Sequence, residues 1–267
     1  MMIIMDNTHA DLGEYLREYY VLKSAGDLDG VTGLFRSDAV YADATLGWRI
    51  DGLDALSAGW AEYMPGWVQR GAVSYPTRVL GDATGGVAFV TASPELFGGE
   101  LRALAGVSIV DGLIVRFIDY WDGRQLDLSS MRVPDDQFPL SFGEDLPAAR
   151  EHGLLDEAVD RLVSGEYPLA TDVTLEDLTL RVRVHGKNAT ATLWEQLPYG
   201  GGVKVCRVMG GPRGGGFEWI SPDGPVNRGI TAVALDSDGR IAELCSTWDG
   251  ARVSDALLRE WHGSALG

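Results

Sequence analysis

The sequence predicts an α+β fold made of two similar units in tandem. Patterns typical of helices come first in the chain, and a long run of strand patterns separated by tight turns follows them. A motif that ends the first half, Asp111-Gly112 followed by Trp121, recurs 127 residues later as Asp238-Gly239 and Trp248. We therefore expect a curved antiparallel sheet packed on helices, present twice through an internal duplication.

Three helices are predicted near the start of the chain. Apolar residues recur at helical spacing from Ala10 to Leu22. Asp27 is placed to cap a second, short helix whose apolar face runs through Leu28–Phe35. A third helix is predicted over Leu53–Tyr63, because Pro65-Gly66 follows and is expected to end it.

Strand patterns fill the rest of the first half. Ala39–Asp43 alternates in the manner of a strand, so Tyr41 and Asp43 are predicted on the same face. Asp111-Gly112 is the signature of a tight hairpin. The other strands predicted in this half are Val73–Leu80, Val87–Leu96, Leu101–Val110 and Leu113–Trp121.

A linker is predicted over residues 124–149, which are rich in proline and aspartate and show little periodicity. We therefore divide the chain into a first unit, residues 1–123, and a second unit, residues 150–267. The second unit is predicted to begin with a helix at Arg150–Val163. Its predicted strands are Leu178–Val184, Ala189–Gln196, Val203–Met209, Phe217–Ile220, Ile230–Leu235 and Ile241–Trp248.

The composition excludes several classes of function. The chain has 267 residues, with 22 Lys and Arg against 39 Asp and Glu, a formal net charge of −17. A chain this acidic offers no basic surface to nucleic acid or anionic lipid. Its uncharged runs are shorter than the ~18 residues that a membrane helix needs, and no signal peptide is visible. We expect a soluble, cytoplasmic protein with neither a nucleic-acid nor a membrane partner.

Metal, disulfide and covalent-triad chemistry are not expected. Cys206 and Cys245 are too few for a disulfide framework or a zinc site. The four histidines are scattered along the chain and lack metal-ligand spacing. No G-x-S-x-G nucleophile motif and no nucleotide-binding glycine motif occurs. We therefore expect no cofactor and no metal.

Two stretches of the first unit resemble a known superfamily. The opening stretch resembles the ketosteroid isomerases and SnoaL-like polyketide cyclases of the nuclear transport factor 2-like superfamily; it comprises Ala25–Gly30, Leu34-Phe35, Asp38–Asp43 and Gly52. The closing stretch, Asp111–Asp122, is similar to the last strand of SnoaL-like proteins and of limonene-type epoxide hydrolases. The resemblance covers residues 10–123 well and residues 150–250 weakly. It implies two cone-shaped barrels, packed through their sheets as an intramolecular pseudo-dimer.

The resemblance singles out four candidate catalytic residues. Asp43 falls where the isomerases place a proton-shuttling aspartate, and Tyr19 falls where they place an oxyanion-stabilising tyrosine. Asp119 falls where the epoxide hydrolases place the aspartate that activates water. Tyr41 and Asp43 fall at the positions of the pair that holds that water, although the hydrolases have an asparagine where this chain has Asp43.

Neither known site is reproduced in full. The second aspartate of the isomerases is expected near Ala105-Gly106, where this chain has no carboxyl group. The arginine of the hydrolases is expected within Thr91–Glu95, where no arginine occurs and only Glu95 offers a replacement.

The second unit is interpreted as a degenerate copy that acts mainly as a scaffold. Ser246 stands at the position that matches Asp119, so this copy lacks the candidate base. It also shows no clear counterpart of Ala25–Asp43 and is expected to carry a glycine-rich insertion around Pro212.

The residues themselves support acid–base chemistry at Asp43 and Asp119. Each aspartate lies within an otherwise apolar strand, and an unpaired charge facing a core costs several kcal/mol. Two carboxyl groups in one apolar cavity push their pKa values apart, so that one donates while the other accepts a proton. The alternative is that strand alternation points one of them to solvent. Tyr19 and Tyr41, likewise, can be packing residues.

Four further residues are predicted to bind substrate: Trp48, Trp60, Trp121 and Glu95. The tryptophans suit an aromatic or hydrophobic ligand. Glu95 is a possible third carboxylate, with a surface position at the end of a strand as the alternative.

The resulting hypothesis is a cofactor-independent enzyme that cyclises a hydrophobic intermediate of secondary metabolism, by epoxide opening or aldol-type closure. Asp119 is the expected base, Asp43 the acid or second shuttle, and Tyr41 and Tyr19 orient water or an oxyanion. Tandem copies also occur among polyether-forming epoxide cyclases of the same superfamily. The alternatives are a double-bond isomerase, an epoxide hydrolase, or a binding protein that uses the same cavity for a small hydrophobic molecule without catalysis.

Overall fold

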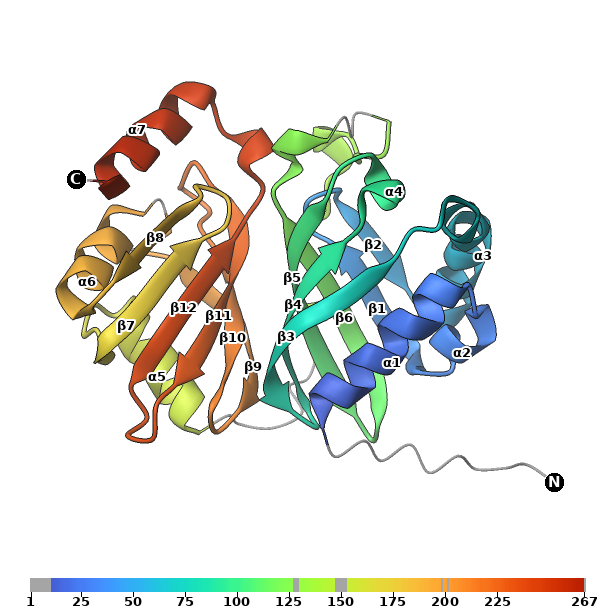
Figure 1. Cartoon of the computed structure of the whole chain (residues 1–267), viewed down its shortest axis with the longest axis horizontal. Helices are drawn as coiled ribbons and strands as arrows, with labels where there is room; N and C mark the ends of the chain where they lie inside the picture. The colour runs from blue at the N-terminus through green and yellow to red at the C-terminus, as the bar shows by residue number, and fades with distance from the viewer. Residues whose placement is uncertain (1–10, 127–129, 147–152, 198, 201, 267) are drawn as a thin grey trace.

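The computed structural model describes residues 11–126, 130–146, 153–197, 199–200 and 202–266. It consists of two α+β halves placed side by side (Figure 1). The two sheets face each other in the middle of the molecule, and the helices cover their outer sides (Figure 1). Over the described residues, no helix combines the length and the apolar character required to span a membrane.

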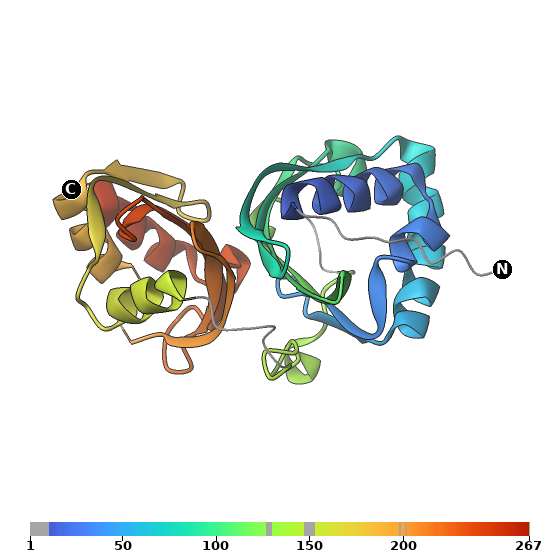
Figure 2. The same ribbon diagram turned by 90° about the horizontal axis from the view of Figure 1, so that it is seen from below.

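The first half contains one six-stranded sheet with the order β2-β1-β6-β5-β4-β3. Its helices are α1 (Leu12–Ala25), α2 (Leu28–Thr32), α3 (Leu53–Arg70) and the short α4 (Pro94–Phe97). Its strands are β1 (Phe35–Asp43), β2 (Trp48–Asp51), β3 (Ser74–Asp82), β4 (Gly85–Ala92), β5 (Leu101–Val110) and β6 (Leu113–Trp121). Figure 2 shows this sheet curving around α1.

The second half repeats this plan with the order β8-β7-β12-β11-β10-β9. Its helices are α5 (Leu154–Val163), α6 (Lys187–Gln196) and α7 (Asp255–Leu266). Its strands are β7 (Leu169–Asp177), β8 (Val182–His185), β9 (Lys204–Gly211), β10 (Gly214–Ile220), β11 (Arg228–Leu235) and β12 (Ile241–Thr247). Two matching sheets in sequence confirm the predicted tandem α+β fold.

Each sheet is mixed rather than antiparallel throughout, which corrects the prediction. The last four strands of each half form the expected antiparallel meander, but the first strand pairs in parallel with the last one. This pairing brings the beginning and the end of each half together. It also decides where the candidate site lies, as described below.

Several predicted elements have the wrong type or length. The strand predicted over Val87–Leu96 ends at Ala92, and Pro94–Phe97 forms helix α4. The third helix does not end before Pro65-Gly66 but continues to Arg70, because proline removes only one helical hydrogen bond and the left-handed Gly71 supplies the end. Ala189–Gln196 is helix α6 and not a strand. Its alternating Ala and Thr suggested a strand, but Thr190, Leu193 and Trp194 have helical spacing and are all buried.

The two halves are more alike than the sequence suggested. Strand β7 is the counterpart of β1, although Leu178–Val184 had been predicted as the strand there; the chain turns after Asp177 and resumes in β8. The glycines around Pro212 are not an insertion, since the turn from Gly210 to Gly215 has the same length as the turn from Gly81 to Gly86. In both hairpins the strands approach so closely that a Cβ on the first glycine would lie 2.3–2.5 Å from a carbonyl oxygen.

Strand alternation gives each sheet two different faces. In β6, Phe117 and Trp121 belong to the inner core between the sheet and helices α1 and α3. Ile118 and Tyr120 face the opposite way and pack against the second half. Asp119 therefore lies on the inner face of the first half, with Phe117 and Trp121.

A buried ion pair joins the halves. The Arg116 guanidinium forms two hydrogen bonds with the Glu218 carboxylate, and both side chains are almost completely buried. Tyr120 donates a third hydrogen bond to Glu218 at 2.8 Å, and Arg116 Nε donates to the Phe142 carbonyl at 2.8 Å. Phe142, in the predicted linker, is itself buried, so the described part of this segment is packed along the interface.

Candidate functional site

The parallel pairing of β1 with β6 places the two candidate carboxylates next to each other. Asp43 and Asp119 are paired residues in the register of these strands. Tyr41 lies two residues before Asp43 and belongs to the inner core. Three of the four residues predicted as catalytic, Tyr41, Asp43 and Asp119, therefore lie near the ends of two neighbouring strands.

Asp119 is the more accessible carboxylate of the two. It keeps part of its accessible surface, and the Tyr41 hydroxyl donates a hydrogen bond to its Oδ2 at 3.0 Å. Tyr41 is in turn held by stacking on Phe117, with 5.6 Å between the ring centres. Burial raises the pKa of Asp119, while the nearby charge of Lys23 and the hydrogen bond from Tyr41 act in the opposite direction.

Asp43 is almost fully buried, and both oxygens of its carboxylate accept hydrogen bonds from the protein. Oδ1 accepts from the backbone N–H groups of Thr45 (2.9 Å) and Leu46 (2.7 Å), and Oδ2 accepts from Nε1 of Trp121 (2.9 Å). Burial and the charge of Asp119 raise the pKa of Asp43 to about 7, against these hydrogen bonds.

The second half repeats the surroundings of Asp43. Asp177 accepts from the Leu180 N–H at 2.6 Å and from Nε1 of Trp248 at 2.9 Å. A threonine two residues after each aspartate, Thr45 or Thr179, bridges to the backbone of the matching tryptophan. Because this set occurs in both halves, it ties the end of the first strand to the end of the last one and is part of the fold.

Tyr19 on α1 has a buried hydroxyl group without a partner. The side chain has no accessible surface and its ring contacts Tyr20, Trp60 and Phe117. Within the described part of the chain, its hydroxyl makes no hydrogen bond. Burial and the charge of Asp119 raise the pKa of Tyr19, so the group remains a neutral donor. An unsatisfied buried hydroxyl costs ~1–3 kcal/mol, which makes it a natural position for contact with a ligand.

Lys23 belongs to the same site and was missed in the sequence. It follows Tyr19 by one turn of α1, and its Nζ lies 5.6 Å from the centre of the Tyr19 ring and 5.5 Å from that of Trp67. Burial lowers the pKa of Lys23, while the charges of Asp119 and Asp43 oppose that shift. The spacing of Tyr15, Tyr19 and Lys23, four residues apart on the buried face of one helix, was the signal that could have revealed it.

Aromatic side chains extend the site toward solvent. Trp48 stacks on Tyr63 with 5.8 Å between ring centres, and Tyr63 stacks on Trp67 at 6.3 Å. Trp48 and Trp67 are half-buried and Tyr63 is 42% exposed. Trp60 lies deeper, 5.7 Å from the Tyr41 ring. These rings provide an apolar approach to Lys23.

Glu95 does not join this cluster. It was predicted at the end of a strand but lies in the short helix α4, where it is exposed. The Ser93 side chain lowers its pKa through a hydrogen bond. Glu95 is thus a surface residue, as the alternative prediction had it. It does not provide a third carboxylate beside Asp43 and Asp119.

The equivalent interior of the second half is closed. Ser246, the counterpart of Asp119, is fully buried and shares a hydrogen bond of 2.9 Å with Thr231. Tyr199 is also fully buried and donates to Asp177 at 2.6 Å. No counterpart of the accessible carboxylate at Asp119 therefore exists at this position, and the site is asymmetric.

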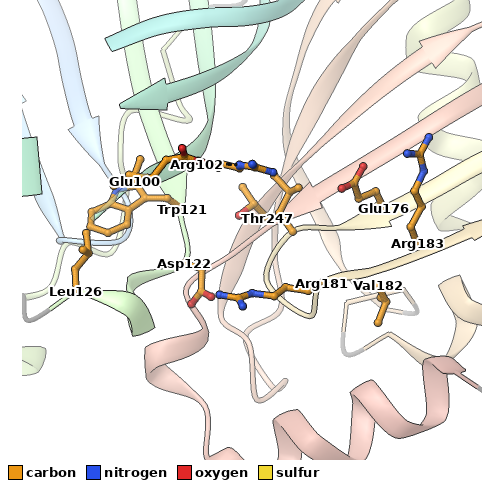
Figure 3. A pocket seen from close by; sticks show the side chains of 12 residues that line it. Glu100, Arg102, Trp121, Asp122, Leu126, Glu176, Arg181, Val182, Arg183 and Thr247 are labelled. Carbon is orange, nitrogen blue, oxygen red and sulfur yellow. Dashed lines mark hydrogen bonds and ion pairs between the residues drawn. The ribbon is translucent and has the colours of Figure 1, made fainter. Parts of the chain in front are cut away.

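A separate cavity of about 540 Å³ lies between the two halves (Figure 3). Trp121 and Leu126 contribute its apolar wall from the first half, and Val182 does so from the second. The charged side chains around it are Glu100, Arg102, Asp122, Glu176, Arg181 and Arg183. Trp121 connects the two places, since it lines this cavity and donates a hydrogen bond to Asp43.

Over the described residues, no group of three or more His, Cys, Asp or Glu side chains is arranged to hold a metal ion.

Comparison with known proteins yields structural similarity only. No protein-family model and no curated protein matches the sequence. A candidate polyketide cyclase from Sinorhizobium meliloti matches with 24% identity and a TM-score of 0.35, over 40% of this chain and 94% of its own. A hypothetical protein from Catenulispora acidiphila with a ketosteroid isomerase-like fold, in complex with trimethylamine, matches with 13% identity and a TM-score of 0.35, over 46% and 95%.

A third solved structure, an NTF2-like protein of unknown function from Burkholderia xenovorans, is 20% identical with a TM-score of 0.35, over 40% of this chain and 80% of its own. Each of these proteins matches less than half of this chain. At this level of similarity, none of them assigns a residue or a reaction to it.

Proposed function

We propose that the first half is a cofactor-independent acid–base enzyme that acts on a small hydrophobic molecule, with Asp119 as the base. The observation that carries this proposal is the pairing of an accessible carboxylate, Asp119, with the unpartnered hydroxyl of Tyr19 in an aromatic interior. A carboxylate of raised pKa is well suited to accept a proton near neutral pH.

The roles follow from the hydrogen bonds. Tyr41 donates to Asp119 and so holds its carboxylate in one orientation. Tyr19 donates to the substrate oxygen on which negative charge develops, because its hydroxyl has no other acceptor in the described part of the chain. Asp43 accepts a hydrogen bond from Trp121 and so fixes that ring, while the charge of Asp119 contributes to the raised pKa of Asp43.

For the reaction, we propose ring closure of a hydrophobic intermediate by epoxide opening or aldol-type addition. In either case Asp119 removes a proton from the attacking hydroxyl or carbon, and Tyr19 stabilises the oxygen that becomes negative. A double-bond isomerase and a simple epoxide hydrolase use the same two groups. The products separate the three reactions, since only hydrolysis of the epoxide adds a whole water molecule to the product.

The test uses two apolar probes, a β,γ-unsaturated ketone and an epoxide that carries an internal hydroxyl. Deuterium uptake from D₂O, ¹⁸O uptake from labelled water and ring formation are followed by mass spectrometry. Asp119→Asn is expected to lower the rate ~10²–10⁴-fold, and Asp136→Asn, at an exposed aspartate, is the matched control. Equal rates in the two variants would overturn the role of Asp119.

A second candidate function is binding of a small molecule without catalysis, and the cavity between the halves favours it. Its volume of about 540 Å³ lies within the ~300–1,000 Å³ of typical ligand sites. Arg102, Arg181 and Arg183 offer donors to an anionic group, and Trp121 offers an apolar wall. A fluorescent aromatic sulfonate serves as the probe, and Arg181→Gln with Arg183→Gln is expected to weaken its binding at least tenfold. Binding that persists in this double variant would exclude the cavity as an anion site.

A further inference from the structure

Lys23 is an amine enclosed by aromatic rings rather than paired with an acid. Its Nζ lies 5.5–5.8 Å from the ring centres of Tyr19, Tyr20 and Trp67. Among the described residues, no carboxylate lies within ion-pair distance of it, and Asp119 and Asp43 act on it only through their fields. Aromatic rings thus replace part of the water that surrounds a surface lysine, and the Lys23 side chain remains partly accessible.

The amine lies over the same ring that carries the unpartnered Tyr19 hydroxyl, 5.6 Å from the ring centre. Tyr19 and Lys23 extend from successive turns of one face of α1, with about 6 Å between their positions along the helix axis. Tyr19 offers a hydrogen bond and has no acceptor in the described part of the protein. Lys23 offers a lone pair once it has lost a proton. A carbonyl group satisfies both, because its oxygen accepts the hydrogen bond and its carbon accepts the lone pair.

We propose that Lys23 forms an imine with an apolar aldehyde or ketone in the first half. The inference rests on the proposed function and deepens it, because it names carbonyl compounds as the substrate class. The stacked rings of Trp48, Tyr63 and Trp67 form the apolar approach to the amine. Burial of Lys23, which lowers its pKa, increases the fraction of neutral amine.

The step balances without any co-reactant. Nζ attacks the carbonyl carbon, a C–N bond forms, and the π electrons of the carbonyl move to its oxygen. The carbon–oxygen bond breaks and that oxygen leaves as water, whose two hydrogens both come from the Lys23 ammonium; Asp119, the carboxylate whose charge acts on Lys23, is the proposed carrier. The product is a protonated imine, which withdraws electrons from the neighbouring carbon and so makes the proton there easier for Asp119 to remove.

The selectivity of labelling can be measured within one molecule, because the chain contains only three lysines: Lys23, Lys187 and Lys204. Lys187 and Lys204 are exposed and serve as internal controls in the same molecule. The full-length protein is treated at pH 7 with 2-naphthaldehyde and cyanoborohydride, and the labelled peptides are quantified by mass spectrometry. We expect at least tenfold more label on Lys23 than on either control, and at least a threefold loss of that preference in Tyr19→Phe.

Formaldehyde under the same conditions separates site binding from simple amine reactivity. Because formaldehyde has no apolar body, its preference for Lys23 is expected to be at least threefold smaller than that of 2-naphthaldehyde. Equal labelling of the three lysines by 2-naphthaldehyde in the folded protein, checked by circular dichroism, would overturn the proposal. Lys23→Arg should remove the labelled peptide without changing the label on Lys187 and Lys204.

The outcomes distinguish this inference from the proposed function. If Lys23 is not labelled while deuterium uptake still depends on Asp119, the imine is wrong and the acid–base enzyme stands. If Lys23 is labelled selectively but Asp119→Asn leaves deuterium uptake unchanged, the imine stands and the role of Asp119 fails.

Discussion

Asp43 and Asp119 are neighbours in the sheet, but their surroundings differ. Asp43 accepts three hydrogen bonds from groups of its own fold, whereas Asp119 accepts one, from Tyr41, and remains accessible. The counterpart of Asp43 is kept in the second half as Asp177, whereas the counterpart of Asp119 is Ser246. These differences support the proposal that Asp119 is the reactive carboxylate and Asp43 a structural one.

The first prediction concerns the coupling between these two groups. The charge of Asp119 contributes to the raised pKa of Asp43, so Asp119→Asn is expected to lower the Asp43 pKa from about 7. The measurement is a ¹³C NMR titration of the Asp43 carboxyl carbon. An unchanged midpoint would show that burial alone sets the pKa of Asp43.

The same coupling predicts the pH dependence of stability. The Asp43 pKa is raised from 3.8 to about 7 on folding, so the folded state holds its proton more tightly than the unfolded state does. The stability that results is fully present below about pH 4 and is lost as the pH rises toward 7. In urea unfolding between pH 4 and pH 7, this loss is expected to be smaller in Asp119→Asn than in the unchanged protein. An equal loss in both would contradict the coupling.

A third prediction at the residue scale concerns the effect of the Tyr19 hydroxyl on stability. Tyr19→Phe removes a buried hydroxyl without a partner and is expected to increase the free energy of unfolding by ~1 kcal/mol. Tyr15→Phe is the matched control on the same helix. The Tyr15 hydroxyl donates to the carbonyl groups of Leu34 and Gly112, so its loss is expected to destabilise. A loss of stability in both variants would indicate that Tyr19 has a structural partner.

At the scale of elements, one turn occurs twice with different residues at a left-handed position. After the aspartate that ends β1, the turn reaches Gly47 at φ 80°, and after the aspartate that ends β7 it reaches Arg181 at φ 59°. A left-handed backbone costs a non-glycine residue ~1 kcal/mol relative to glycine. Arg181 also lines the cavity between the halves. Its guanidinium can therefore donate hydrogen bonds to an anion bound there.

We therefore expect Arg181→Gly to increase the free energy of unfolding by ~1 kcal/mol and to weaken binding of the aromatic sulfonate. Urea unfolding and fluorescence titration measure the two effects. The reverse change, Gly47→Arg, is expected to destabilise, because a Cβ at Gly47 would lie 2.5 Å from the Phe138 ring. A loss of stability in Arg181→Gly would contradict this expectation. It would show that contacts of the Arg181 side chain stabilise the fold by more than the left-handed backbone costs.

At the scale of the whole molecule, the Arg116–Glu218 pair holds the halves together. Both side chains are buried, so neutralising Glu218 leaves an uncompensated guanidinium in the interface. Glu218→Gln is expected to lower the free energy of unfolding by ~3–5 kcal/mol. The matched control is Glu243→Gln, which breaks the exposed Arg78–Glu243 pair between the same halves; its expected cost is below ~1 kcal/mol. Guanidinium unfolding compares the two, and similar losses would show that the buried pair is not a principal link.

Much of the site was predictable from residue type and local pattern. Aspartates within apolar strands indicated buried carboxylates, and the alternation in Ala39–Asp43 correctly placed Tyr41 and Asp43 near each other. Lys23 escaped prediction because a lysine near the end of a helix is usually solvated, and only the packing of α1 inside the curved sheet turns it inward. Glu95 was assigned to a strand because the apolar run before it was extended to Leu96, although Ser93-Pro94-Glu95 has the residues typical of a helix start.

The sequence by itself determined helices α1, α2, α3 and α5, the meander strands, the tight hairpins and the duplication, since these depend on periodicity and turn residues within short segments. Helices α4, α6 and α7 were not predicted. Only the tertiary structure decided the parallel pairing of the first strand with the last, because a non-local pair leaves no periodic trace in either strand. That pairing brings Asp43 beside Asp119 and gives both halves the same tie between aspartate and tryptophan. It also decided which candidate carboxylate stays accessible, because accessibility depends on how residues distant in sequence fill the space around it.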